Sequence, residues 1–343
     1  MRSYIYCRRS QTIGAAIFLA ALQAVAAQSA LPQSAPPSHE RASIKAAVQA
    51  KSQAQTSSSS QPAVVLEFPQ KVSLGTLFSM NKGQDVARVG AARGPVSVPA
   101  DMRLALTASY ALLNDKGAMD LLPKNCLTKI NLDRVEADDE KPFDISFLKK
   151  QERLEFIVDM QTDITEESVT ALGELKNLKY IELWYVGFKG TKLSAIAKLP
   201  KLEELVLAYN PLSQPAWQAI GTMQQLRKLS ISSCGATDQA MVEVGRLTKL
   251  KQLRMGKNLK VTSRGFANLK NLKQLNHLDL ENTMFCLQDV QYIRNIPLKE
   301  IHISSRRFTK SDLQQLKKQL PKVSVVESDK VDNETQYIFS PLK

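Results

Sequence analysis

Residues 175–183 read LKNLKYIEL, with apolar side chains at places that we number 0, 3, 6 and 8. The same arrangement returns in four further segments: LPKLEELVL (199–207), MQQLRKLSI (223–231), LTKLKQLRM (247–255) and LKQLNHLDL (272–280). A weaker sixth copy, NIPLKEIHI (295–303), has Asn295 at place 0 and keeps the apolar residues at places 3, 6 and 8. The starts of successive copies lie 23 to 25 residues apart. An apolar pattern that recurs at this interval is typical of a solenoid, a fold built from stacked structural repeats.

Two less regular copies precede these six. The first contains Leu127, Ile130 and Leu132, and the second begins near residue 150, with Phe156 and Val158 in its strand places. Within a short strand, successive side chains point to opposite faces. Places 6 and 8 are therefore predicted to face a shared core, and places 5, 7 and 9 to face away from it.

Place 11, three residues after the last strand leucine, is expected to stabilise the turn that leaves the strand. An Asn or Cys side chain there can hydrogen-bond to exposed backbone groups of the turn. The six copies carry Val186, Asn210, Cys234, Asn258, Thr283 and Arg306 at this place, so three of the six comply.

The second half of each copy is predicted to be helical. Thr165 stands before Glu166 and Glu167, and Thr309 precedes Asp312 with the spacing of a capping box. Each copy thus reads strand, turn, helix, turn. About eight such units would stack into a continuous core, with neighbouring strands about 4.8 Å apart.

The pattern Leu-x-x-Leu-x-x-Leu-x-Leu-x-x-Asn/Cys, held from about Leu122 to Val326, resembles the leucine-rich repeat superfamily in its ribonuclease-inhibitor-like class. The resemblance implies an α/β solenoid curved into a horseshoe, with parallel strands on the concave face and helices on the convex face. It implies a binding scaffold and transfers no catalytic residue.

Shorter phrases resemble one group within this class. The segments DITEESV (163–169), ATDQAM (236–241) and ARGPVSVP (92–99) are similar to exported bacterial leucine-rich repeat proteins of the planctomycete type. Similar repeats also serve in eukaryotic ubiquitin-ligase adapters. Those adapters would carry an F-box ahead of the repeats, and we find no such segment in the sequence.

The first 62 residues are predicted to hold an export signal and a linker. Residues 1–27 place Arg2, Arg8 and Arg9 ahead of an apolar run that ends in small residues, which is the layout of a secretory signal peptide. An uncleaved membrane anchor is the alternative, although the run is shorter than the ~20 residues a spanning helix usually needs. Residues 28–62 are rich in Ala, Gln, Ser and Pro, a composition typical of a disordered linker.

The remaining chain is predicted to divide into three parts. Residues 63–121 contain strand-like segments at 64–68 and 96–98 between Gly and Pro turns, which indicates a small β-containing lead-in or cap. The repeat domain occupies residues 122–327, and residues 328–343 form a C-terminal tail.

Charge and cysteine content narrow the function only partly. A formal net charge of +13 and a pI near 9.5 favour an acidic partner without identifying one. Removal of the signal would leave Cys126, Cys234 and Cys286, whose odd number and wide spacing suit neither a disulfide framework nor a zinc site. We therefore expect core roles for these thiols, and neither a cofactor nor a metal.

The predicted partner-binding surface lies at outward-facing places of the strands. Its centre is an aromatic group on two neighbouring copies, and Trp and Tyr rings offer a large contact area with few rotatable bonds to freeze. Alternatively, the rings pack on the irregular copy before them and cover that end of the solenoid. The predicted set is Tyr180, Glu182, Trp184, Tyr185, Glu204, Tyr209, Arg254, Asp279 and His302.

Place 7 also carries a Ser, an Asp and a His in different copies, which raises the question of hydrolysis. Ser230 and His302 would stand three strands apart, roughly 14 Å at the usual spacing, which is too far for proton transfer. Asp279, His302 and the nearby His277 form at most a weak metal pattern, because a polar face produces such neighbours by chance.

Lysines recur where the chain enters each strand, and stacking would align them into a basic edge. Such an edge can attract polyanions in a salt-dependent way, but a solvated edge is the simpler interpretation. Nucleic acid is not favoured, because no aromatic residues interleave the lysines. The set is Lys176, Lys179, Lys201, Lys249, Lys251, Lys270, Lys273 and Lys299.

The sequence therefore predicts an exported, non-catalytic scaffold that binds a protein partner in the periplasm, at the cell surface or outside the cell. Two alternatives stay open. One is a binder of an anionic envelope polymer that uses the basic edge. The other is an enzyme whose chemistry resides in residues 63–121.

Overall fold

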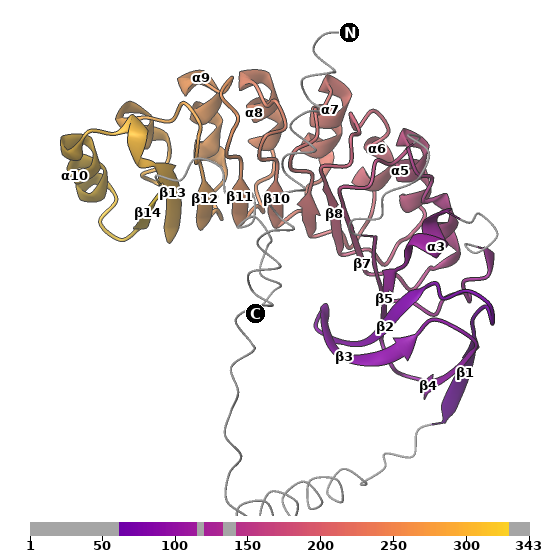
Figure 1. Cartoon of the computed structure of the whole chain (residues 1–343). Helices are drawn as coiled ribbons and strands as arrows, with labels where there is room; N and C mark the ends of the chain where they lie inside the picture. Colours follow the sequence, from indigo (N-terminus) through magenta and orange to yellow (C-terminus); the bar gives the residue numbers. More distant parts are fainter. Residues whose placement is uncertain (1–61, 115–119, 133–141, 329–343) are drawn as a thin grey trace, which may run out of the picture. The chain divides into compact units, whose positions relative to one another are not determined.

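Short strands from successive repeats lie side by side in one long sheet, in the order β14-β13-β12-β11-β10-β9-β8-β7-β6-β5-β2-β3. Figure 1 shows the computed structural model of the chain, which describes residues 62–114, 120–132 and 142–328. From β5 to β14 every neighbouring pair of strands is parallel, whereas β2 runs antiparallel to both β5 and β3. The fold is therefore an α/β solenoid, as predicted.

The strands within the described ranges are short. Those of the lead-in region are β1 Ala63–Glu67, β2 Gly75–Asn81, β3 Gln84–Ala91, β4 Pro95–Pro99 and β5 Leu104–Ala108. Those of the repeats are β6 Lys129–Asn131, β7 Phe156–Met160, β8 Tyr180–Trp184, β9 Glu204–Val206, β10 Lys228–Ser230, β11 Gln252–Arg254, β12 His277–Asp279, β13 Glu300–Ser304 and β14 Ser324–Ser328.

Helices connect the strands and cover one face of the sheet (Figure 1). The α-helices are α3 Tyr110–Asn114, α5 Glu166–Leu172, α6 Ser194–Ala197, α7 Gln214–Thr222, α8 Asp238–Val244, α9 Ser263–Phe266 and α10 Lys310–Gln319. The 3-10 helices are η1 Ser146–Lys150, η2 Ala267–Asn271, η3 Leu287–Tyr292 and η4 Ser305–Arg307. We call the other face of the sheet the open face.

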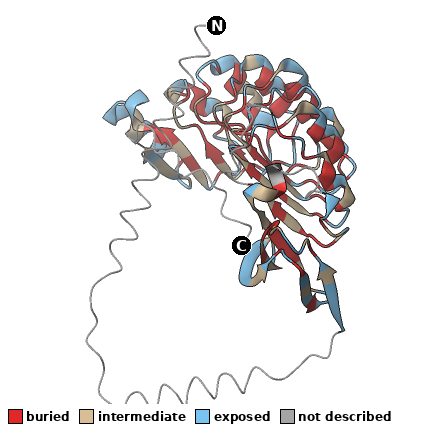
Figure 2. Ribbon diagram, turned by 45° about the vertical axis from the view of Figure 1, so that its right-hand side comes forward, coloured by how far each residue is buried: buried red, intermediate tan, exposed pale blue. Residues whose placement is uncertain are grey.

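The leucine places of the six regular copies meet in one core between the sheet and the helices. Leu205, Leu229 and Leu253 pair side by side at place 6 of adjacent strands, and each is at most 1% exposed. Figure 2 shows this buried layer in red along the strands and the inner sides of the helices. The inward and outward places predicted from the period of the regular copies are confirmed.

Asparagines at place 11 hold the turns that leave the strands. The Asn210 side chain donates to the carbonyl oxygens of Leu183 and Leu207, at 2.7 and 2.9 Å, and accepts from the backbone N–H of Val186 at 3.0 Å. Cys234 repeats part of this pattern, because its thiol lies 3.1 Å from the Leu207 carbonyl oxygen. The hydrogen-bonding role predicted for place 11 is confirmed.

The residue just before each of these positions adopts a left-handed backbone conformation. Place 10 has φ of 55° at Tyr185, 62° at Tyr209, 56° at Ser233, 58° at Lys257 and 52° at Asn282. For a side chain other than glycine this conformation costs about 1–2 kcal/mol. After Tyr209 and Lys257 the place 11 side chain is an asparagine that bridges two turns, and we infer that its hydrogen bonds offset the cost there.

Both predicted helix caps are present. The Thr165 hydroxyl accepts from the backbone N–H of Ser168 at the start of α5. At α10, Thr309 and Asp312 form a reciprocal capping box. These caps satisfy N–H groups that have no partner inside the helix, which fixes where each helix begins.

The irregular second copy is shifted by one residue from the prediction. Ile157 pairs with Ile181 and Asp159 with Leu183, so the inward places belong to Ile157 and Asp159 rather than to Phe156 and Val158. The copy therefore begins at Gln151, whose amide group bonds to the 123–127 segment. Two polar residues in leucine places, both 0% exposed, had hidden this register from the apolar pattern.

The lead-in region contributes two sets of strands. β1 and β4 cover the two segments predicted as strands, and they pair antiparallel with each other. β2 and β3 form a hairpin that the sequence analysis did not predict, with Lys82 and Gly83 both at positive φ in its turn. Through β5 this hairpin continues directly into the parallel sheet. The proposed boundary between lead-in and repeats, near residue 121, stays a prediction.

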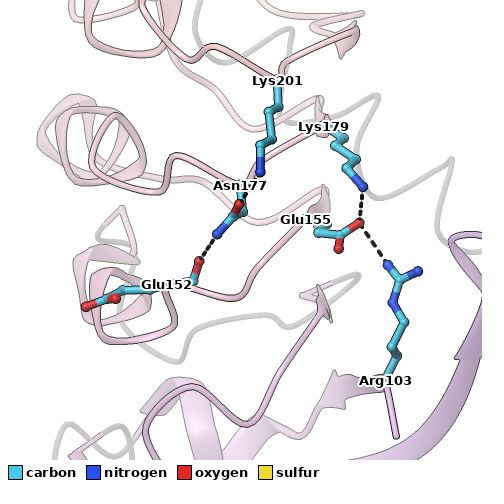
Figure 3. Close-up of polar contacts among 6 residues, drawn as sticks. All are labelled: Arg103, Glu152, Glu155, Asn177, Lys179 and Lys201. Atoms are coloured by element: carbon cyan, nitrogen blue, oxygen red, sulfur yellow. Dashed lines mark hydrogen bonds and ion pairs between the residues drawn. The ribbon is translucent and has the colours of Figure 1, made fainter. Parts of the chain in front are cut away.

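A charged cluster joins the lead-in to the repeats on the edge where the chain enters the strands. The Glu155 carboxylate lies 2.8 Å from the Arg103 guanidinium and 2.7 Å from the Lys179 ammonium (Figure 3). Arg103 immediately precedes β5, and the other two residues precede β7 and β8. One carboxylate thus links the entries of β5, β7 and β8, across the intervening β6.

Several predictions fall outside the described residues. These are the signal peptide at 1–27, the linker as far as residue 61, and the tail from residue 329 onward. In the described ranges, no helix combines the length and apolar character needed to cross a membrane.

Candidate protein-binding surface

The open face carries the side chains at places 5, 7 and 9 of each strand, together with the left-handed place 10. These places come from one residue in two along the strands and from the turn after them. The predicted contact residues all lie here, from Tyr180 on β8 to His302 on β13. The sheet register sets their lateral neighbours: Arg254 pairs with Asp279, and Asp279 pairs with His302.

Three aromatic rings meet at the end of β8 and β9 and form what we call the aromatic cluster: Trp184, Tyr185 and Tyr209. The Trp184 ring centroid lies 5.9 Å from that of Tyr185 and 5.2 Å from that of Tyr209. Both tyrosines occupy place 10 and have a left-handed backbone. All three rings are half-buried.

Small apolar side chains form the floor beside this cluster. Val206 and Ala208, each 1% exposed, form a hydrophobic group separate from the main core, and Tyr180, Trp184 and Tyr209 pack against it. Because the rings cover these two side chains, the floor supports the rings from below, on a face whose other outward places are mostly polar. The floor was not among the predicted contact residues.

Tyr180 has a more structural position than the other rings. Its ring centroid lies 6.4 Å from that of Phe156, on the preceding irregular copy. Its hydroxyl donates to Glu182 at 2.5 Å, and burial, reinforced by this carboxylate, raises the pKa of Tyr180. Packing on the preceding copy therefore describes Tyr180, whereas the aromatic cluster turns toward the following copy.

Two predicted contact residues are buried acids. Glu182 and Glu204 are 4% and 5% exposed. The Glu204 carboxylate lies 3.3 Å from the Lys228 ammonium on the next strand, and burial raises the pKa of Glu204 against the opposing effect of that lysine. Buried acids of this kind shape and polarise the surface from below and offer a partner little area.

The far end of the open face holds an acid–histidine group. The His302 imidazole lies 2.6 Å from Glu300 and 3.7 Å from Glu281, and hydrogen bonding to Glu281 and then Glu300 raises its pKa to about 9. Burial raises the pKa of the neighbouring Asp279 to about 6. At neutral pH, His302 is therefore cationic and surrounded by acids.

The arrangement of strands bears on both chemical alternatives for this face. Ser230 on β10 and His302 on β13 are separated by β11 and β12, which excludes a proton relay between them. Among the residues that the structure describes, no group of three or more His, Cys, Asp or Glu side chains could hold a metal ion.

A basic pocket that the sequence analysis missed lies at the carboxyl ends of β11 to β13. Three of its lining residues are cations and none is an acid, and Leu259 beside them is 65% exposed. Lys257 links the pocket to the aromatic cluster, because its ammonium donates to the Tyr209 hydroxyl at 2.8 Å and lies 5.2 Å from that ring's centroid. The pocket is lined by Lys257, Leu259, Asn282, Thr283, Ser304, Arg306 and Arg307.

The predicted basic edge is not a uniform lysine ridge at its start. Glu155 binds Lys179 there, and Glu203 lies 3.2 Å from Arg227. Lys201 donates to the Asn177 side chain at 2.6 Å, and Asn177 donates in turn to the backbone carbonyl oxygen of Glu152 (Figure 3). Around β7 to β10, this edge is therefore a polar ladder between repeats that contains both signs of charge.

The repeats and the sheet define a fold of the leucine-rich-repeat type. Residues 220–338, less than half of the chain, match the family model of the FTH domain. An internalin from Listeria monocytogenes is 18% identical over 64% of this chain and 65% of that chain, with a TM-score of 0.44. A chain of the Toll–Spätzle complex from Drosophila is 16% identical over 61% of this chain and 31% of that chain, also with a TM-score of 0.44.

Both matches span less than two thirds of the other chain. Likenesses of this size carry no functional information. None of the curated proteins compared with this sequence matches it.

Proposed function

We propose that the protein is a non-catalytic scaffold that binds a protein partner on its open face, with the aromatic cluster as the principal contact. The observation that carries this proposal is the convergence of Trp184, Tyr185 and Tyr209 beside an apolar floor. Binding energy at protein interfaces concentrates in such aromatic anchors, surrounded by polar residues that exclude water.

The cluster is suited to binding because its rings are already held in place. Trp184 contacts both tyrosines, and Lys257 holds the Tyr209 hydroxyl. Side chains fixed before association lose less conformational freedom on binding, which leaves more of the contact energy as affinity. Arg254 and the acid–histidine group extend the same face and provide polar contacts around the rings.

We infer the cellular setting from the sequence alone. Residues 1–27 would direct export, residues 28–62 would act as a linker, and residues 63–121 would cap the repeat domain at 122–327. The proposed setting is the periplasm, the cell surface or the extracellular space of a bacterium of the planctomycete type, with an N-terminal membrane anchor as the alternative.

Capture of partners by the full chain tests the proposal. The protein is immobilised and exposed to extracts and envelope fractions of the source organism at low and moderate salt, and retained proteins are identified. The double variant Trp184→Ala, Tyr185→Ala should lose a partner that the parent retains at moderate salt. Loss of one such anchor typically costs about 2 kcal/mol, roughly 30-fold in Kd.

The matched control is Tyr110→Ala, which removes a 47% exposed ring on α3, outside the open face. Undiminished capture by the double variant would remove the aromatic cluster from the binding site. Capture of anionic polymers only, lost as salt rises, would instead favour the basic edge. Activity retained by residues 63–121 alone would favour the enzyme alternative.

A further inference from the structure

The basic pocket and the aromatic cluster adjoin on the open face, because Lys257 lines the pocket and contacts Tyr209 of the cluster. Its backbone lines the turn after β11, and its side chain reaches Tyr209, two repeats earlier. Place 10 of the repeat between them is Ser233, which has a short side chain. A ligand that spans this surface needs acidic groups at one end and apolar or aromatic groups at the other.

The chain's own C-terminal segment, residues 329–343, has this composition in the required order. It reads DKVDNETQYIFSPLK, with Asp329, Asp332 and Glu334 ahead of Tyr337 and Phe339. Only one base, Lys330, stands among the three acids. The acidic part would meet the three cations of the pocket, and the aromatic part would follow it along the surface.

The place where this segment begins sets its reach. Residue 329 follows Ser328, the last residue of β14, and Ser328 pairs with the pocket residue Ser304 on β13. The acids therefore begin one strand away from the pocket. From β14 to β9 the sheet advances five strands, about 24 Å, while the nine residues from 328 to 337 span up to about 30 Å when extended. Tyr337 and Phe339 can therefore reach the aromatic cluster.

We propose that residues 329–343 dock in cis on the open face, with the acids over the basic pocket and Tyr337 and Phe339 on the aromatic cluster. The segment then occupies the surface that a protein partner would use. This regulatory consequence rests on the proposed function, but the docking itself does not. A partner must displace the segment, so binding of the two is mutually exclusive.

Tryptophan fluorescence of the full chain tests the docking directly. The chain has two tryptophans, and Trp217 is buried on α7 at 3% exposure, so acrylamide quenching reports mainly on Trp184. Replacing Tyr337 and Phe339 together by Ser should raise the quenching constant roughly twofold, because the rings no longer exclude the quencher from Trp184. Far-UV circular dichroism checks that the fold is kept.

A charge-reversal pair tests the acidic end. Arg307→Glu should raise Trp184 quenching in the same way, and adding Glu334→Lys should restore the protection. The matched control is Lys322→Glu, an exposed lysine in the loop between α10 and β14, which should leave quenching unchanged. Equal quenching in parent and variants would overturn the proposal. Protection that depends on protein concentration would also overturn it, because the segment would then dock between two copies.

The outcomes separate this inference from the proposed function, since no partner is present in the quenching experiment. Protection of Trp184 by the segment, combined with failure of the partner capture, would leave the docking standing and remove the scaffold proposal. The reverse result would do the opposite.

Discussion

Replacing Asn258 with Ala should strongly destabilise the fold, because this side chain serves two consecutive turns. It is 1% exposed, donates to the carbonyl oxygens of Ile231 and Met255 at 2.9 Å each, and accepts from the backbone N–H of Ala236 at 2.9 Å. Alanine would leave one buried N–H and two buried carbonyl oxygens short of partners. At about 1–2 kcal/mol for each stranded group, the expected loss is about 3–6 kcal/mol.

Equilibrium unfolding in urea, followed by far-UV circular dichroism, measures this loss. The control is Asn271→Ala, an exposed asparagine in η2 whose replacement should change stability by less than about 0.5 kcal/mol. Cys234→Ala provides a graded comparison, since that thiol approaches mainly one carbonyl oxygen, and should cost about 1–2 kcal/mol. If the two variants Asn258→Ala and Asn271→Ala had free energies of unfolding within about 1 kcal/mol of each other, the turns would not depend on the hydrogen bonds of the place 11 asparagines.

Three further predictions concern other parts of the structure. The pKa of His302 is raised from 6.5 to about 9, so its contribution to stability is full below pH 6.5 and is lost as the pH rises to 9. The urea midpoint of unfolding should therefore fall between pH 6.5 and pH 9, and His302→Gln should remove this pH dependence. Burial raises the pKa of Cys126 and Cys234 to about 12, so a thiol reagent at pH 8 should label them only after unfolding. Gly187→Ala should lower stability by about 1–3 kcal/mol in urea unfolding, because φ is 69° there and the added methyl group would lie 2.6 Å from the Asp163 carboxylate.

Much of the fold can be predicted from the sequence because the same apolar places recur in every regular repeat and so fix its register. The apolar residues at places 3, 6 and 8 return six times and the one at place 0 five times, and a residue that is ambiguous in one copy is fixed by its equivalents in the others. The strand places, the helix caps at Thr165 and Thr309, and the hydrogen bonds at place 11 were all predictable on this basis.

The register predicted from the apolar pattern is wrong where a copy departs from that pattern. Gln151 and Asp159 occupy leucine places, so the nearest apolar residues suggested a register that is wrong by one residue. Along a strand, a shift of one residue exchanges the inward and outward faces. The β2–β3 hairpin was missed because it occurs once and has no equivalents to confirm it.

The sequence predicted which strand places carry the candidate site, but not how deeply each of these side chains is buried. The period placed Trp184, Tyr185 and Tyr209 near one another, and their ring contacts agree with that placement. It gave no indication that Glu182 and Glu204 are buried, which depends on the side chains above them. The basic pocket was missed because Arg306 and Arg307 follow β13, the strand of the last copy that the apolar pattern identifies.

The left-handed residue of each turn has a consequence for how this protein can change. Its backbone conformation is held by hydrogen bonds at the neighbouring place 11, so the side chain at place 10 can differ between copies. It is Tyr, Tyr, Ser, Lys and Asn in successive copies. Each copy thus has one surface position, place 10, that tolerates different side chains, and these positions recur at a constant spacing along the sheet. Substitutions at place 10 can therefore change what the surface binds without changing the backbone of the repeats. The side chains at these positions set which partner the surface can accept.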